Sequence, residues 1–81
     1  MENPIPGFER ITIDGSRMNG QPCIRGTRLT VRRVLQLVSE YPNREELFQE
    51  FPDLSEDDLR EALSYAALRI EDRAVELHVS E

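Results

Sequence analysis

The spacing of apolar residues in the second half of the sequence is the feature that most restricts the fold. From Val31 to Leu77 these residues recur at intervals of three and four, which is the period of an amphipathic helix. Pro42 and Pro52 divide this region, because proline interrupts or ends a helix. The pattern therefore predicts three helices within residues 31–78.

The residues before each predicted helix support this division. Thr30, Asn43 and Ser55 each precede an apolar period, and their side chains can accept a free backbone N–H as N-caps. The third helix opens with three acidic residues, which suit the positive end of the helix dipole. Its predicted buried stripe consists of Leu59, Leu63, Ala66, Ala67, Ile70, Ala74 and Leu77.

The N-terminal part has the alternation of short strands. The segment "FERITIDG" predicts a strand that ends in a turn, and "CIRGTRL" predicts a second strand interrupted at Gly26. We expect the two strands to pair as an antiparallel hairpin. The predicted fold is thus a single, mainly α domain over residues 1–81, with a β-hairpin region at 1–30 and a three-helix region at 31–78. The short join "FPDLS" between the second and third helices fits a helix-turn-helix unit.

The residue types that usually stabilise small domains are scarce. Cys23 is the only cysteine and His78 the only histidine, so the sequence predicts no disulfide within the chain, no metal site and no cofactor. Because a chain of 81 residues buries a limited core, we expect a homodimer. No apolar run is long enough to span a membrane, and no signal peptide is visible, so we expect a cytoplasmic protein.

Charge divides the chain into two unlike halves. The net charge is −6, and all ten basic residues are arginine. Residues 1–38 carry six arginines against three acidic residues, a net of +3, whereas residues 39–81 carry four against thirteen, a net of −9. Such asymmetry indicates two charged surfaces with different partners, or halves that attract each other.

The segment "PCIRGTRLTVRR" is the one feature with chemical content. It places Arg25 and Arg28 around Gly26-Thr27, and Arg32 and Arg33 in the first turn of the first predicted helix. Arginine grips phosphate or carboxylate in two places, so this cluster fits contact with a nucleic-acid backbone. It fits equally well salt bridges to the acidic half, within the chain or across a dimer, and the sequence leaves both interpretations open.

No set of residues in the sequence predicts an enzyme, because nucleophile–base pairs, phosphate-binding glycine motifs and metal-ligand clusters are missing. The third helix is also a poor recognition helix for DNA. It would present Glu56, Asp57 and Glu61 to phosphates, with only Arg60 to offset them.

Two motifs resemble a known family. "GQPCIRGTRLTV" followed by "FPDLSEDDLREALSYAA" is similar to the small bacterial domain-of-unknown-function family 433, over roughly Ile11 to Ala67. Position 30, often proline in that family, is Thr30 here. The matching positions are Gly20, Pro22, Ile24, Arg25, Gly26, Thr27, Arg28, Leu29, Val31, Pro52, Leu54, Ser55, Ala62, Leu63, Tyr65 and Ala66.

The resemblance implies both a fold and a function. The family is described as helix-turn-helix or homeodomain-like, and its members look like VapB-type antitoxins of type II toxin–antitoxin pairs, partnered with a small PIN-like nuclease. It therefore implies neutralisation of a nuclease toxin and binding of operator DNA. The candidate DNA-binding residues are Arg25, Thr27, Arg28, Arg32, Arg33 and Arg60, and the candidate toxin-binding residues are Arg69, Arg73 and Leu77. The alternative hypothesis is a protein-interaction module that dimerises and does not bind DNA.

Overall fold

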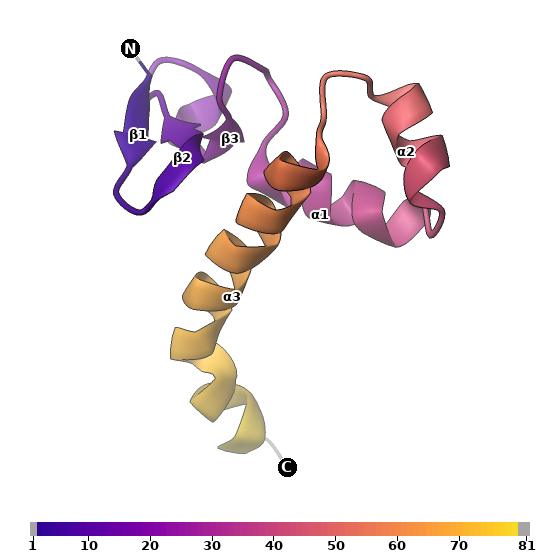
Figure 1. Ribbon diagram of the computed structural model, residues 1–81. Coiled ribbons are helices and arrows are strands. Elements are labelled where there is room, and N and C mark those ends of the chain that lie inside the picture. The colour runs from indigo at the N-terminus through magenta and orange to yellow at the C-terminus, as the bar shows by residue number, and fades with distance from the viewer. Residues whose placement is uncertain (1, 80–81) are drawn as a thin grey trace.

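The computed structural model describes residues 2–79, with side chains described for residues 2–70. The strands are β1 (Asn3–Ile5), β2 (Phe8–Ile13) and β3 (Cys23–Ile24), and the short 3-10 helix η1 (Met18–Gly20) lies between β2 and β3. The helices are α1 (Val31–Glu40), α2 (Arg44–Glu50) and α3 (Glu56–Val79). The sheet lies beside the first half of α3, α1 crosses α3, and α2 lies beyond the far end of α1 (Figure 1).

The N-terminal sheet has three strands, so the predicted β-hairpin is wrong. The strand order is β1-β2-β3, and both pairings are antiparallel. Sequence reasoning missed β1 because it has three residues and contains Pro4, which lacks a ladder N–H. An edge strand tolerates proline because one side of it needs no partner. The turn into β2 depends on Gly7, whose φ of +89° suits glycine.

The second predicted strand is mostly a loop. Only Cys23 and Ile24 pair with β2, opposite Thr12 and Ile11 respectively. Of the bulge or positive φ angle that we expect at Gly26, the structure has the positive φ, +78°, and the chain turns there and ends the strand.

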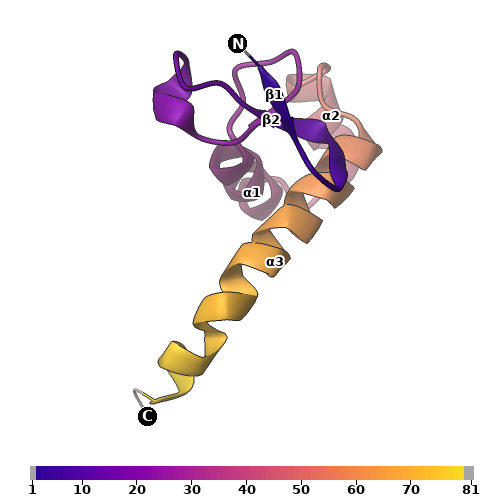
Figure 2. The ribbon, with the colours of Figure 1, turned by 90° about the vertical axis from the view of Figure 1, so that its left-hand side faces the viewer.

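The predicted homeodomain-like helix-turn-helix unit is also wrong. The sheet packs against the first half of α3, where the Phe8 and Tyr65 rings meet edge to face at 5.4 Å. The second half of α3 continues past the sheet and α1 as an arm (Figure 2). The first half of α3 is thus a packing element of a mixed sheet-and-helix body.

The three predicted helix starts are confirmed. Thr30 Oγ1 accepts the Arg33 N–H at 3.0 Å, and Asn43 Oδ1 accepts the Glu46 N–H at 3.1 Å. Ser55 Oγ accepts the Asp58 N–H at 3.2 Å. Each cap satisfies a backbone donor that the helix itself leaves open.

The core joins the sheet to all three helices. Its members come from β2, β3, the three helices and the α2–α3 connection: Ile11, Ile24, Val31, Val34, Leu37, Leu47, Leu54, Leu59 and Ala62. The predicted α3 stripe is only partly correct. Leu59 is buried, but Leu63 is 41% exposed although Tyr65 beyond it still packs on Phe8. Ile70 is 56% exposed, because the helix continues past the body there.

Candidate functional site

A tight turn presents the first two arginines of the predicted cluster. The Thr27 N–H donates to the Ile24 carbonyl at 3.0 Å, and the positive φ of Gly26 at the third position fits a type II turn. Thr27 Oγ1 donates to the same carbonyl at 2.8 Å and accepts the Leu29 N–H at 3.0 Å. The Thr27 hydroxyl therefore holds the turn together, while Arg25 and Arg28 on either side are exposed.

Backbone pairing fastens this turn to the start of α1. Cys23 and Thr30 form an antiparallel bridge, and the Ile24 N–H donates to the Leu29 carbonyl at 2.9 Å. The Val31 N–H donates to the Pro22 carbonyl at 2.9 Å. The turn and the first residues of α1 thus form one compact unit.

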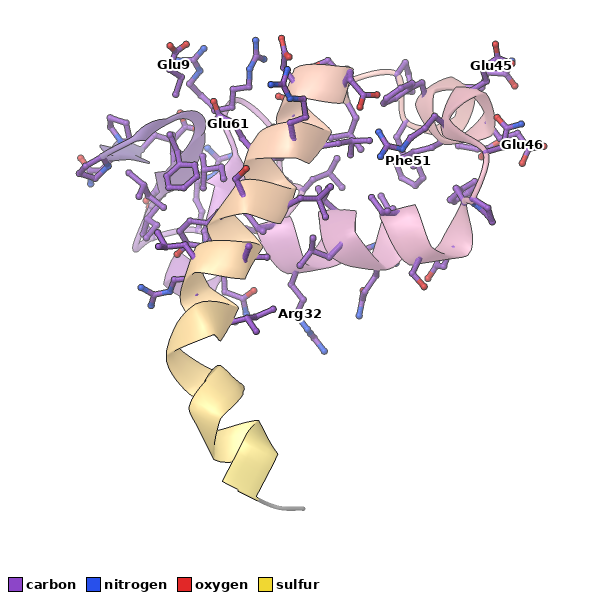
Figure 3. The ribbon with its side chains drawn as sticks, turned by 60° about the horizontal axis from the view of Figure 1, so that its bottom comes forward. Glu9, Arg32, Glu45, Glu46, Phe51 and Glu61 are labelled. Carbon is purple, nitrogen blue, oxygen red and sulfur yellow. The ribbon has the colours of Figure 1, made fainter. Side chains whose placement is uncertain are left out.

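Three arginines on this unit lack an ionic partner among the described residues. Arg25, Arg28 and Arg32 are exposed, and none of them lies within 4 Å of a described carboxylate. Figure 3 shows the Arg32 side chain pointing away from the body. Arg33 differs, because its Nη1 lies 3.5 Å from Glu40 Oε2 along α1. We refer to Arg25, Arg28 and Arg32 as the arginine edge.

One carboxylate already binds beside the arginine edge. The Gly26 N–H donates to Glu2 Oε2 at 3.1 Å, and Gly26 is exposed. A side-chain Cβ at Gly26 would meet no atom within 4 Å, so the surface beside the Gly26 Cα is open. The turn therefore binds an oxyanion through its backbone as well as displaying two guanidinium groups.

The acidic opening of α3 is neutralised within the chain. Arg10 of β2 places Nη1 3.2 Å from Asp58 Oδ1 and Nη2 3.5 Å from Asp57 Oδ2, and its backbone N–H donates to Glu61 Oε1 at 2.9 Å. Asp58 is 6% exposed and also accepts the Ser55 N–H at 2.9 Å, completing a reciprocal cap.

The other two arginines near this acidic opening are also paired. Arg44 Nη1 lies 2.6 Å from Glu56 Oε2, and Arg60 Nη1 lies 3.6 Å from Asp57 Oδ1. Arg60, a predicted DNA contact, therefore lies among carboxylates and lines a surface pocket with Glu9 and Glu61, which Figure 3 labels. The structure does not join Arg60 to the arginine edge.

Sequence reasoning did not single out Arg10. Its partners lie 47 to 51 positions away, and no local spacing connects a strand residue with the first turns of a helix so distant in sequence. The available signal was a charge pattern: a lone arginine in a strand, and three consecutive acids that need counter-charges.

The exposed acids of α2 remain without ion pairs among the described residues. Glu45, Glu46 and Glu50 lie on α2 and Asp53 follows it, and all four are exposed. In Figure 3 Glu45 and Glu46 point outward from α2, away from Arg32. The body thus carries an arginine edge and a separate acidic end.

The candidate toxin-binding residues lie on the arm of α3. The Arg69 guanidinium lies 5.9 Å from the centre of the Tyr65 ring, a cation–π contact, and Arg69 is exposed. The side chains of Arg73 and Leu77 lie outside the described residues.

Two titratable groups near the sheet have pKa values shifted from their usual range. Hydrogen bonds from the Ser16 hydroxyl and N–H, at 2.6 and 2.9 Å, hold the pKa of Asp14 well below its usual range. Any stabilisation from Asp14 is therefore present above the pKa of an unfolded aspartate and is lost as the pH falls through the folded pKa. Burial raises the pKa of the Cys23 thiol, so this thiol is a weaker nucleophile at neutral pH.

Two other features are absent from the described residues. No group of three His, Cys, Asp or Glu side chains in this part of the chain is arranged to hold a metal ion. Within the same residues, no helix has the length and apolarity needed to cross a membrane.

The fold and site together define a small sheet-and-helix domain that displays a cationic turn. The sequence profile of the family described as "Protein of unknown function (DUF433)" matches residues 11–66, from β2 to the middle of α3. The chain belongs to this family, which confirms the predicted resemblance at the family level. Comparisons with curated proteins and with solved structures gave no match.

Proposed function

We propose that the protein is a cytoplasmic, antitoxin-like binding protein of a type II toxin–antitoxin pair, and not an enzyme. It contacts the phosphates of its operator DNA and neutralises a PIN-like nuclease. The proposal thus has a DNA half, the operator contact, and a toxin half, the neutralisation of the nuclease. The observation that supports the DNA half is the arginine edge. Arg25, Arg28 and Arg32 are exposed and lack described carboxylate partners, whereas Arg10, Arg44 and Arg60 already form ion pairs with the three acids that open α3.

The arrangement suits a phosphate backbone more than a base edge. Exposed guanidinium groups bind phosphate oxygens without reading sequence, and the backbone N–H of Gly26 beside them already donates to a carboxylate oxygen, that of Glu2. Such contacts release counterions, so each phosphate bound lowers log K by roughly 0.9 per unit increase in log salt concentration. We expect the acidic end at α2 to face away from the DNA.

The DNA half is tested by fluorescence anisotropy with the DNA upstream of the coding sequence, measured at several salt concentrations. We expect steeply salt-dependent binding, with a weaker affinity and a shallower salt slope in Arg25→Ala and Arg28→Ala. The matched control is Arg44→Ala, which removes an exposed arginine that is already paired with Glu56. Absent binding, salt-independent binding, or equal loss in the control would reject this half.

The toxin half is supported by the family resemblance and by the arm of α3. The arm leaves the body, and Arg69 on it is exposed. Arg69 or Arg73 can offer a guanidinium to the acidic metal site of a nuclease, with Leu77 as an apolar contact. The test is co-expression with the neighbouring gene: we expect growth only when this protein is present. Unimpaired growth with the neighbour alone would contradict antitoxin action.

A second candidate function is a dimerising interaction module that does not bind DNA. The observation that favours it is the set of unpaired acids on α2, Glu45, Glu46 and Glu50, which can meet the arginine edge of a second copy. Sedimentation analysis separates the candidates. If Arg25→Ala or Arg28→Ala dissociates the dimer, the arginines form the dimer contact, whereas an intact dimer leaves them available for DNA.

A further inference from the structure

An apolar groove opens where α1 meets the middle of α3. Its walls are Pro22, Val31 and Leu35 on one side and Tyr65, Ala66 and Ile70 on the other, and its volume is about 310 Å³. Arg32 and Arg69 also line it and add positive charge. The groove continues the face of α3 that is buried higher up, where Leu59 and Ala62 pack in the core.

Among the described side chains, the apolar face of α3 is no longer covered by the body at Ile70. Ile70 lines the groove and is 56% exposed. The helix continues from there to Val79 (Figures 1 and 2). The sequence places Ala74 and Leu77 four and seven positions after Ile70, which is the spacing of one helix face. An exposed apolar face of this kind usually marks an interaction surface.

We propose that a second copy of the chain covers this surface. The two α3 helices lie antiparallel and cross near Ile70, so that the arm of each chain lies over the groove of the other. In this arrangement the partner subunit's Ala74 faces Ala66, and the partner subunit's Leu77 faces Leu63, which is 41% exposed in the single chain. The proposal assigns an interface that shares Arg32 with the arginine edge and Arg69 and Leu77 with the proposed toxin contact, so a toxin would compete with the second copy for the arm.

Self-complementarity favours a second copy over another helix. A two-fold interface uses the same patch on both subunits, and here the groove and the arm that fills it are successive parts of one helix. A helix rises about 1.5 Å per residue, so the nine residues after Ile70 in α3 are long enough to pass Ala66 in the groove and reach the level of Leu63.

Charge complementarity points to the same occupant. The groove carries Arg32 and Arg69, whereas the arm beyond Ile70 contains Glu71, Asp72 and Glu76 against Arg73 alone. An antiparallel pair centred on residue 70 sets Arg69 opposite the partner subunit's Glu71, one residue on either side of the centre. Opposite charges at these positions favour the antiparallel register over a parallel one.

Analytical ultracentrifugation of the full chain tests the interface with a matched pair of variants. Ile70→Glu places a charge at the proposed centre, and Leu68→Glu makes the same change at a side chain of similar exposure, 53%, outside the groove. We expect wild type and Leu68→Glu to be dimers and Ile70→Glu to be a monomer with unchanged helical circular dichroism. A monomeric wild type, a dimeric Ile70→Glu, or equal dissociation of both variants would overturn the proposal.

Disulfide trapping tests the register. In a Cys23→Ala background, a cysteine replacing Ile70 lies near its own copy, so Ile70→Cys should cross-link rapidly under mild oxidation, whereas Leu68→Cys should not. Equal cross-linking at both positions, or none at residue 70, would contradict an antiparallel pair centred there. Both tests use this chain alone, so their failure leaves the DNA and toxin proposals standing, and failure of those leaves this interface standing.

Discussion

Asp58 is the residue on which the joint between sheet and helix depends. It is 6% exposed, accepts the Ser55 N–H and binds the Arg10 guanidinium at 3.2 Å. One carboxylate therefore caps α3 and attaches β2 to it. Its neighbour Asp57 is 59% exposed by side chain and binds the same arginine more loosely, at 3.5 Å.

This difference predicts that substitutions at these two adjacent positions lower the free energy of unfolding by different amounts. Asp58→Ala removes a cap and leaves the Ser55 N–H and part of the Arg10 guanidinium without partners, which should lower the free energy of unfolding by about 2 kcal/mol. Asp57→Ala removes only exposed ion pairs and should cost about 0.5 kcal/mol or less. Urea denaturation of both variants measures the two values, and equal losses would show that Asp58 is not the joint.

At the residue scale, sequence reasoning identified exposed charges better than paired ones. The cluster around Gly26 was visible because its arginines are adjacent in sequence, and the structure leaves three of its four without a described ionic partner. Arg60 looked equivalent in sequence but lies beside Asp57. Arg10 was missed because its partners become neighbours only after the sheet has packed on α3.

At the element scale, local chemistry predicted the helices but not the sheet. The caps at Thr30, Asn43 and Ser55 are formed by residues three positions apart, so they were readable from the sequence. Strand pairing is not local in this way. β1 is three residues long and has little alternation to detect. The segment "CIRGTRL" has strand-forming residues, but only Cys23 and Ile24 pair with β2, and the rest turns back so that the Ile24 N–H donates to the Leu29 carbonyl.

Helix α2 gives the prediction that belongs to this scale. It has seven residues, too few for a stable helix on its own, and Leu47 is its only buried side chain. Leu47→Ala should therefore lower the free energy of unfolding by about 3 kcal/mol. Hydrogen exchange should show that α2 loses protection before α1 does. The control is Phe48→Ala, since Phe48 packs only at the edge of the core, and a larger loss in that variant would contradict the assignment.

At the scale of the whole molecule, the structure is a compact body with a projecting arm. The overall dimensions are 41 × 33 × 21 Å, and the arm accounts for the elongation seen in Figure 2. Sequence periodicity predicted the length of α3 but gave no indication of where the body ends. An apolar helix stripe has the same spacing in the sequence whether the core of the same chain or a second subunit covers it.

A dimer formed through the arm makes thermal stability depend on protein concentration. Unfolding of a dimer releases two chains, so the Tm should rise as the concentration increases. We expect this rise in wild type and in Leu68→Glu, and a constant Tm in Ile70→Glu, by differential scanning calorimetry over a hundredfold range of concentration. A constant Tm in wild type would contradict coupling between assembly and stability.

The contact between Arg10 and Asp58 has a consequence for the folding rate. It joins residues 48 positions apart, so most of the chain must be ordered as a closed loop before the sheet gains its support. Helices α1 and α2 are adjacent in sequence and can meet early, whereas β2 must wait for α3. We therefore expect stopped-flow refolding to be slower than that of an all-helical bundle of this length, with Asp58→Ala mainly accelerating unfolding because this joint closes late.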